Sequence, residues 1–387
     1  MSVIDEGSDV PESSEDRCSA RVEFAEFAAC SLALPTPVRL GDAFYPSRDY
    51  VALRLVDSDG LEGYAFGYSR GTPLAVTLEQ VVRAIAGTPP RDRVAMTQRI
   101  LASSPAVRPL LVRAVSLVDI ALWDLTCKRA GLPLSGMLGC ARDRLAVMPV
   151  AGYFRDVRGD DAVLGELEEY ESRGFAQIKL MIGALHSTET MAFLARAREV
   201  LAADTRIVVD AHYSLNGVPD AVRTAEALRV RGVSLLEDPF IPTAWRKLRE
   251  LRQQSRMELA AGEDVVDPMQ YLDLLESVSV LRVDPTTCGG IRPSITGIEA
   301  AAARGVEVIP HVFTAIGAQL GGSFDAIHCV EHISPSVGAD PIDRYFEHDL
   351  DIGDGEIIID RQPGVGVHLD WGRLRQDSES VVSVRPA

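Results

Sequence analysis

The chain has 387 residues, of which 47% are hydrophobic and 25% charged, and its formal net charge is −17. This composition is ordinary for a soluble globular protein, and the length suits one large domain or two moderate ones. The acidic charge argues against nucleic acid as a partner, and no apolar stretch is long enough to cross a membrane. Six scattered cysteines without a CxxC pair favour reduced thiols and a cytoplasmic protein over a zinc–thiolate site.

The N-terminal segment, residues 1–20, is acidic and polar, unlike a signal peptide, and we expect it to be a disordered tail. Residues 21–140 are predicted to form the N-terminal part of an α+β capping domain. Within it, YVALRLVDSDGLEGYAFGY places a DG turn between two strand-like runs. Further on, RAVSLVDIALWDLTCKRAG is an amphipathic helical stretch that ends at a glycine.

In residues 141–335, short apolar runs alternate with helical stretches. The runs are PVAGYF, AQIKLMI, RIVVD, SLLED, ELAAGED, VLRVD, VEVIPH and AIHCVE. They are continuously apolar, as strands buried on both faces are. Alternation predicts parallel strands, and eight of them favour an α/β fold with a closed (β/α)8-type TIM barrel. A doubly wound open sheet is the rival fold, but no GxGxxG follows the first strand. Residues 336–387 are predicted to return to the capping domain.

Acidic residues stand at the ends of three successive predicted strands: Asp210, Glu237 and Glu263, separated by 27 and 26 residues. Each interval accommodates one strand, one helix and two loops, so the three acids should meet at the same rim of the barrel, where active sites form. Converging carboxylates repel one another unless a cation neutralises them. Oxygen ligands alone suit Mg²⁺, with Mn²⁺ as a possible substitute. Taken singly, each acid could instead be a helix N-cap.

Asp284 and His311 end the next two predicted strands, close enough for a hydrogen bond. A carboxylate on one imidazole nitrogen orients the ring and raises its basicity, which predicts a general base at His311. The structural alternative is a histidine that only packs below the barrel mouth. His212 follows the first predicted ligand by two residues and could be a catalytic acid, or could simply donate a hydrogen bond to a carboxylate.

These segments resemble the mandelate racemase and muconate lactonizing enzyme family of the enolase superfamily. The resemblance rests on VVDAH, LLEDP, AAGED, VDPTTCGGI, IALWDLTCKRAGLPLSGMLG and PGVGVHLD, and the Asp284–His311 pair resembles the racemase-like subgroup. It implies a modified (β/α)7β barrel and an enzyme that removes the proton α to a carboxylate, with Mg²⁺ stabilising the resulting anion. It also implies a hydrogen bond from Glu331, if protonated, to the substrate carboxylate, and a homo-oligomer.

The second-strand motif departs from this family. The family usually has Lys-x-Lys, with the second lysine as a base, whereas this chain has Lys179–Leu180–Met181. Met181 cannot accept a proton, so chemistry with two bases on opposite faces is disfavoured. We therefore predict one-base dehydration of a sugar acid, a lyase reaction in which His311 removes the proton and His212 or His311 protonates the leaving hydroxide. Lys179 would then supply charge near the substrate carboxylate or the metal.

Two alternatives remain open from the sequence: a racemase or epimerase that uses His212 as the second base, and a catalytically silent metal- or ligand-binding barrel. Substrate selection is expected from loops 36–50 and 66–72 of the capping domain. Their candidate residues suit a small polyhydroxylated or dianionic carboxylate, because arginine can hold a carboxylate bidentately. These candidates are Arg39, Tyr45, Arg48, Tyr68 and Arg70.

Overall fold

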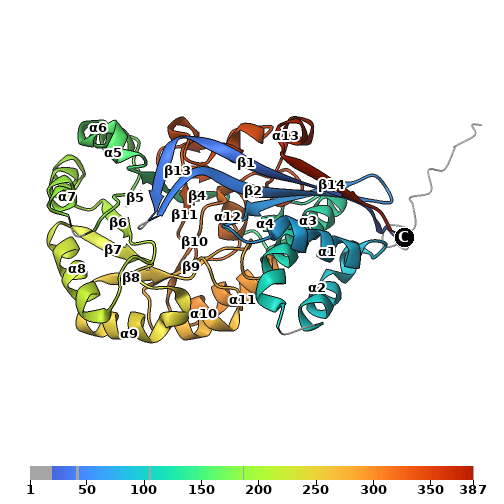
Figure 1. Cartoon of the computed structure of the whole chain (residues 1–387), viewed down its shortest axis with the longest axis horizontal. Coiled ribbons are helices and arrows are strands. Elements are labelled where there is room, and N and C mark those ends of the chain that lie inside the picture. The colour runs from blue at the N-terminus through green and yellow to red at the C-terminus, as the bar shows by residue number, and fades with distance from the viewer. Residues whose placement is uncertain (1–19, 41–42, 104–105, 186, 387) are drawn as a thin grey trace, which may run out of the picture.

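A four-stranded antiparallel sheet and a barrel of parallel strands lie side by side in the computed structural model of the chain (Figure 1). The structure describes residues 20–40, 43–103, 106–185 and 187–386. The predicted acidic tail therefore lies outside the described residues, apart from Ala20. None of the described helices is long and apolar enough to span a membrane. The five described cysteines are free thiols, as expected from their spacing.

The antiparallel sheet combines the two ends of the chain. Its strands, in the order β14-β1-β2-β3, are Ser380–Val384, Val22–Leu40, Ala43–Asp57 and Glu62–Tyr68. Strand β14 pairs with β1 over Ala25–Ala29, so the segment after the barrel completes the N-terminal sheet. Residues 36–40 and 43–50, predicted to be part of a loop, instead belong to strands β1 and β2. The register shifts between Ala33 and Val38, where two prolines lack the N–H groups that a regular ladder needs.

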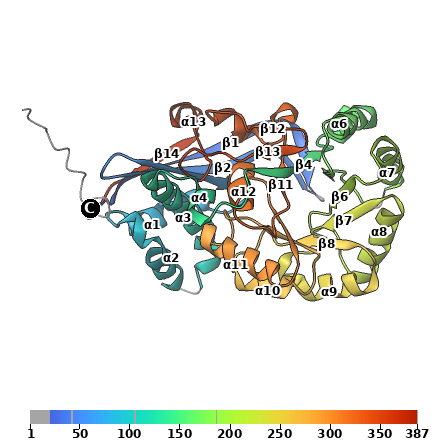
Figure 2. The same cartoon turned by 180° about the vertical axis from the view of Figure 1, so that it is seen from behind.

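Helices pack beside this sheet (Figures 1 and 2). They are α1 (Leu74–Ile85), α2 (Arg93–Ala102), α3 (Arg108–Ala130) and α4 (Leu134–Leu138). The long helix α3 is buried along most of its length and packs against α1 and β3. It ends at Gly131, whose positive φ of 67° allows the backbone N–H to reach the last carbonyls of the helix. The predicted glycine stop is therefore confirmed.

Each barrel strand overlaps one of the predicted apolar runs, although β4 begins at Arg144 and shares only residues 149–151 with PVAGYF. The strands are β4 (Arg144–Ala151), β5 (Gln177–Leu180), β6 (Arg206–Asp210), β7 (Val233–Glu237), β8 (Glu258–Ala261), β9 (Val280–Val283), β10 (Glu307–Pro310) and β11 (Cys329–His332). Strands β4 to β10 pair in parallel in sequence order, and β11 pairs with β4. An isolated bridge between Val308 and Ile327 joins the last two strands and closes the barrel.

The outer helices are α6 (Asp160–Ser172), α7 (Thr188–Val200), α8 (Val218–Val230), α9 (Trp245–Gln254), α10 (Met269–Leu274), α11 (Ile291–Ala302) and α12 (Thr314–Gly321), after a short α5 (Arg155–Arg158). Strand β11 is followed by short 3-10 turns and not by a barrel helix, so the barrel has the (β/α)7β form. The chain then forms a hairpin of β12 (Ile352–Gly353) and β13 (Glu356–Ile358), with β13 antiparallel to β4. Helix α13 (Trp371–Asp377) leads into β14.

Candidate active site

The predicted acids lie together at the carboxyl ends of neighbouring strands. Asp210 and Glu237 are direct register partners at the ends of β6 and β7. Glu263 follows the end of β8 by two residues. The side chains of all three are at most 6% exposed, so their charges need partners within the protein. Parallel strands thus place the three acids at one rim of the barrel, as the spacing predicted.

Lys179 on β5 lies among the acids. Its Nζ atom is 3.0 Å from Asp210 Oδ2, 2.8 Å from Glu237 Oε1 and 3.0 Å from Glu331 Oε1. The lysine side chain is only 3% exposed. Burial lowers the pKa of Lys179, but the three carboxylates outweigh that effect and hold the pKa well above its usual value. Lys179 is therefore a permanent positive charge in this arrangement.

Arg282 is a second buried cation, and sequence reasoning missed it. It is fully buried in β9, with Nε 3.1 Å from Glu237 Oε1 and Nη2 paired with Glu331 Oε2. A signal existed, since VLRVD places an arginine inside an otherwise apolar strand. Burial raises the pKa of Glu331, but Lys179 and Arg282 reverse this and hold it well below its usual range. Glu331 is therefore ionised in this structure and cannot donate the hydrogen bond to a substrate carboxylate that we predicted for its protonated form.

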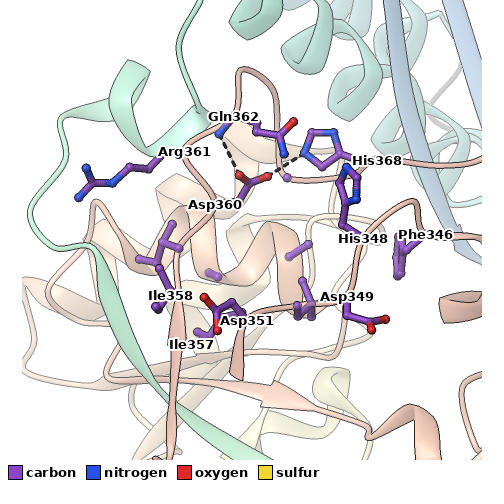
Figure 3. A pocket seen from close by; sticks show the side chains of 15 residues that line it. Phe346, His348, Asp349, Asp351, Ile357, Ile358, Asp360, Arg361, Gln362 and His368 are labelled. Atoms are coloured by element: carbon purple, nitrogen blue, oxygen red, sulfur yellow. Dashed lines mark hydrogen bonds and ion pairs between the residues drawn. The ribbon is translucent and has the colours of Figure 1, made fainter. Parts of the chain in front are cut away.

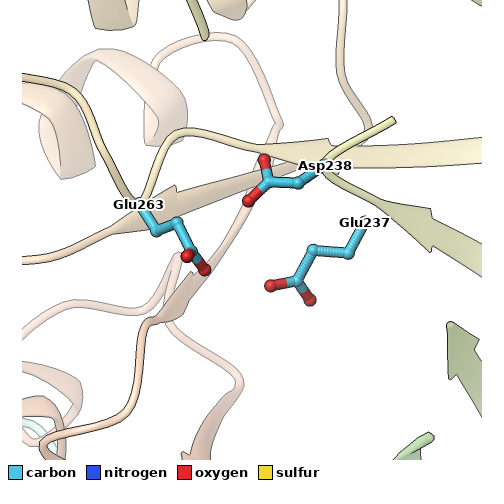
Figure 4. A group of neighbouring side chains, drawn as sticks. All are labelled: Glu237, Asp238 and Glu263. Carbon is cyan, nitrogen blue, oxygen red and sulfur yellow. The ribbon is translucent and has the colours of Figure 1, made fainter. Parts of the chain in front are cut away.

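Four buried carboxylate oxygens have no hydrogen-bond partner among the described residues: Glu237 Oε2, Glu263 Oε2 and both oxygens of Asp238. Each of these three residues offers a ligand atom within 4.8 Å of the others, and the side chains point toward one another (Figure 4). Burial raises the pKa of Glu237 to about 7 and that of Asp238 well above its usual value. Unpartnered oxygens of this kind suit a hard divalent cation.

Asp238 was missed by sequence reasoning, although it stands beside Glu237 in LLEDP. Consecutive strand residues normally point to opposite faces, but Asp238 has a positive φ of 43°, and its side chain lies beside that of Glu237. Asp210 is outside this closest group. Its Oδ1 accepts the backbone N–H of His212 at 2.8 Å and its Oδ2 pairs with Lys179, so its link to Glu237 runs through the lysine.

Asp284 and His311 form the predicted pair. His311 Nδ1 lies 2.9 Å from Asp284 Oδ2, while the other carboxylate oxygen accepts the backbone N–H and the hydroxyl of Thr286, each at 2.7 Å. The remaining ring nitrogen, Nε2, is 3.3 Å from Glu263 Oε2 and so faces the acidic cluster. Burial lowers the pKa of His311, but Glu263 and Asp284 more than offset this and raise it. The ring is therefore oriented and basic.

Arg70 extends from the loop after β3 across to the barrel. Its guanidinium is 3.1 Å from Glu263 Oε1 and 2.8 Å from Asp264 Oδ2, and Nη2 is 3.2 Å from His311 Nε2. Asp264 also accepts hydrogen bonds from Arg113 at 2.6 Å and from the Tyr213 hydroxyl at 3.0 Å. Arg70, predicted as a substrate ligand, is thus held by acids of the barrel and links the cap to the predicted base.

A single pocket contains most of the remaining candidates. His212 and Met181 line it together with Lys179 and His311. Arg48 and Tyr68, from the cap, line it as well. The structure does not bring the other two predicted substrate residues into this pocket. Arg39 lines an adjoining cavity with Gly183, and its guanidinium stacks on Phe44, while Tyr45 lies on the exposed end of the hairpin.

A separate cavity of about 300 Å³ lies between α12 and the segment after the barrel (Figure 3). His368 Nε2 is 2.7 Å from Asp360 Oδ2 there, and the His348 ring stands beside the His368 ring with centroids 6.4 Å apart. None of the residues predicted to bind metal or substrate lines this cavity. The predicted site residues therefore lie away from this cavity.

Two family models match the chain. The model described as mandelate racemase / muconate lactonizing enzyme, N-terminal domain, matches residues 28–139. The model described as enolase C-terminal domain-like matches residues 162–373, which is more than half of the chain. The first match covers most of the cap and the second begins inside α6 and extends through the rest of the barrel.

Similar proteins include several sugar acid dehydratases. The L-talarate/galactarate dehydratase of Salmonella typhimurium is 25% identical over 90% of this chain and 89% of its own length. The arabinonate dehydratase of Saccharolobus solfataricus is 24% identical over 84% and 89%. The crystal structure of the Salmonella enzyme superposes with a TM-score of 0.86 at 22% identity, covering 100% of this chain and 98% of that one. An L-talarate dehydratase from Polaromonas sp. JS666, complexed with Mg and L-glucarate, has a TM-score of 0.84 at 23% identity, covering 95% of this chain and 100% of that one.

Proposed function

Because the chain belongs to the mandelate racemase and muconate lactonizing enzyme family of the enolase superfamily, we propose that it is a Mg²⁺-dependent sugar acid dehydratase. The single observation that carries the proposal is the orientation of His311. One ring nitrogen is fixed by Asp284, and the other faces the cluster of buried carboxylates. This arrangement suits removal of a proton from a carbon atom whose carboxylate group is neutralised next to it.

The acids at the rim would hold the ion. We propose Asp210, Glu237 and Glu263 as its ligands, with Asp238 as a further candidate because both of its oxygens are buried without a partner. When bound, Mg²⁺ would stabilise the negative charge that develops on the substrate carboxylate as the α-proton leaves. Lys179 would add positive charge on the side of Asp210 and Glu331.

The proposed reaction uses one base. His311 Nε2 accepts the α-proton, and the electrons of the C–H bond form a C=C bond as the β-carbon loses its hydroxyl group. His212 or His311 supplies the proton that converts this group into water, and the enol product rearranges to a 2-keto acid. Asp284 orients the His311 ring throughout. Met181 lines the pocket but cannot exchange a proton, which favours elimination over chemistry with two bases.

The substrate class follows from the relatives and from the charged pocket. The relatives act on sugar acids of two kinds, since galactarate and talarate carry two carboxylates and arabinonate carries one. Both kinds have a hydroxyl group on the β-carbon, as dehydration requires. We propose a sugar acid substrate on this basis. Replacement of Mg²⁺ by Mn²⁺, assembly into a homo-oligomer and a cytoplasmic location stay predictions from the sequence.

A second candidate function is epimerisation. The observation that favours it is His212, which lines the same pocket as His311 and could act as a second base. The two reactions give different products from the same first step. Dehydration releases a 2-keto acid and water, whereas epimerisation returns an acid with inverted configuration at the α-carbon.

The test is to incubate the purified protein and Mg²⁺ with a panel of one- and two-carboxylate sugar acids in D2O. A dehydratase yields a 2-keto product, detected as its semicarbazone, and this activity should disappear in His311→Asn. His348→Asn, on an exposed histidine outside the pocket, is the matched control and should keep the activity. Deuterium incorporation with inversion at the α-carbon and without a keto product would show that the protein is an epimerase and not a dehydratase. A protein that binds an acid without either outcome would be a silent barrel.

A further inference from the structure

One cation in the pocket differs from the others in lacking an acidic partner. Lys179 and Arg70, which line the pocket, and Arg282, which does not, each form ion pairs with two or more carboxylates. Arg48, on strand β2, forms no salt bridge with any residue in the described part of the chain, although its guanidinium lines the same pocket. A guanidinium largely withdrawn from water and left without an anion is costly, so its presence in the pocket wall favours an anionic ligand.

Arg48 is nevertheless held in place. Its Nε donates to the backbone carbonyl of Ala339 at 3.3 Å, and its guanidinium lies 5.4 Å from the centre of the Tyr68 ring. Neither Nη1 nor Nη2 forms a hydrogen bond with a described residue, so both remain for a ligand in the pocket. Two such N–H groups in a plane match the two oxygens of a carboxylate.

Tyr68 provides a second observation at the same place. Its ring is only 5% exposed and its hydroxyl group is buried, and the hydroxyl forms no well-aligned hydrogen bond with a described residue, although the Asp340 carboxylate lies near it. A buried hydroxyl without a partner is uncommon, and here it belongs to the residue on which Arg48 stacks. An oxygen anion bound by Arg48 would give that hydroxyl an acceptor.

The nearby acid, Asp340, forms no direct ion pair with Arg48. It lies beyond salt-bridge distance of Arg48, and its Oδ1 accepts a hydrogen bond from the Tyr50 hydroxyl. Burial lowers the pKa of Arg48, but Tyr68, Tyr153 and Asp340 outweigh that effect and raise it, so the guanidinium keeps its charge. None of these groups is a proposed metal ligand, which separates this end of the pocket from the acidic cluster.

We propose that Arg48 and the Tyr68 hydroxyl form a subsite for a second carboxylate, so that the substrate is a dicarboxylic sugar acid. This inference rests on the proposed function and goes beyond it, because that function leaves open whether the sugar acid has one carboxylate or two. One carboxylate lies by Lys179 and the acid cluster, next to His311. The other lies by Arg48 on the cap. A sugar hydroxyl at that end would not offset the charge of Arg48.

The test compares acids that differ only at the far end. Glucarate and gluconate, and galactarate and galactonate, share chain length and configuration but differ in a carboxylate against a hydroxymethyl group. Dissociation constants are measured by calorimetry in the Mg²⁺-loaded His311→Asn protein, which binds without turnover. We expect the better dicarboxylate to bind at least about tenfold more tightly than its one-carboxylate counterpart, the range of a hydrogen bond to a charged group.

Adding Arg48→Gln should abolish this preference, and adding Tyr68→Phe should reduce it several-fold. Arg83→Gln removes the same charge from an exposed position on cap helix α1 and should leave the preference intact. Unchanged Mg²⁺ affinity and melting temperature would show that Arg48→Gln is folded. A preference that survives Arg48→Gln, or tighter binding of the one-carboxylate acids, overturns the subsite while leaving a sugar acid dehydratase in place. Failure to bind or dehydrate either class overturns the proposed function, and the subsite with it.

Discussion

The Asp119 carboxylate of α3 accepts the backbone N–H of Ile291, the first residue of α11, at 2.8 Å. One turn earlier, the Ser116 hydroxyl accepts the N–H of Gly289 at 2.8 Å. The longest helix of the cap thus binds the loop that leads into a barrel helix. Two acceptors on α3 satisfy backbone groups that the start of α11 would otherwise leave unpaired. The cap is held against the barrel by buried polar contacts as well as by apolar packing.

Stability should depend on pH through Asp119. Burial raises its pKa from 3.8 to about 7, and the Ile291 N–H and Arg93 only partly offset that effect. Between those two values the unfolded chain has lost the proton while the folded protein retains it, so stability falls as pH rises from about 4 to 7. In Asp119→Asn this loss should be absent. As pH rises over this range, the unfolding free energy of the variant should increase relative to that of the parent by a few kcal/mol, since one pKa unit corresponds to about 1.4 kcal/mol.

Urea denaturation of both proteins at pH 4.5 and pH 8 measures this shift. The control is Asp325→Asn, which makes the same substitution at an acid whose side chain is 90% exposed and therefore escapes the effect of burial. A constant difference between Asp119→Asn and its parent across this range would contradict the assigned protonation of the buried acid.

Gly290 should be intolerant of a side chain. Its φ is 110°, and an added Cβ atom would collide with the Asp119 carboxylate. Gly290→Ala therefore combines backbone strain with overpacking, and we expect it to lower the free energy of unfolding by about 3 kcal/mol. Gly305→Ala is the matched control, since Gly305 also has a positive φ, 65°, but its added Cβ would meet no atom within 4 Å. Equal losses in the two variants, measured by thermal or urea unfolding, would show that the close approach of α3 does not matter.

The Asp284–His311 pair should control proton removal and not metal affinity. Asp284→Asn replaces the acceptor at His311 Nδ1 and favours the wrong ring tautomer, so the rate of α-deuterium exchange should fall at least about a hundredfold. Mg²⁺ affinity, measured by calorimetry, should change little because Asp284 is not a proposed ligand. A variant that loses metal binding in proportion to its activity would show that Asp284 acts on the acidic cluster instead.

Lys179 should compete with a metal ion for the acids that it contacts. Its Nζ atom lies 3.0 Å from Asp210 and 2.8 Å from Glu237, so removing its charge frees two proposed ligands. Lys179→Met should raise Mg²⁺ affinity by about tenfold or more, given the size of charge interactions at this separation. The same variant without metal should be less stable, because buried carboxylates lose a cation. Lys247→Met, at an exposed position on α9, is the charge-matched control, and an equal response of the two variants would exclude competition.

Much of this site could be predicted from the sequence, because the spacing of the apolar runs locates the strand ends. Parallel strands bring residues at equal heights together, so Asp210, Glu237 and the Asp284–His311 pair could be placed from apolar runs alone. What spacing does not contain is the direction of a side chain at the end of a strand. The positive φ of Asp238 sets that direction, and no local pattern in LLEDP announces it.

The sequence also did not predict which cap arginines form ion pairs with acids of the barrel. Arg70 and Arg48 both lie on the cap and both reach the pocket, yet one is taken by Glu263 and Asp264 and the other is not. Whether each arginine forms an ion pair depends on how the cap packs against the barrel. That packing joins residues far apart in the sequence, such as Arg70 and Glu263. Arg282 could not be assigned a role for a different reason. A charged residue inside an apolar strand is unfavourable without buried partners, and its partners Glu237 and Glu331 come from other strands.

The pairing of β14 with β1 has a consequence for synthesis on the ribosome. Strands β1 to β3, which lead to the pocket arginines, are made first, while β14 emerges only after every barrel strand. The edge of β1 at Ala25–Ala29 therefore stays without its final neighbour until the barrel has been translated. During that interval the unpaired edge of β1 is open to pairing with another nascent chain. The first strand of the cap therefore depends on one of the last segments to be translated.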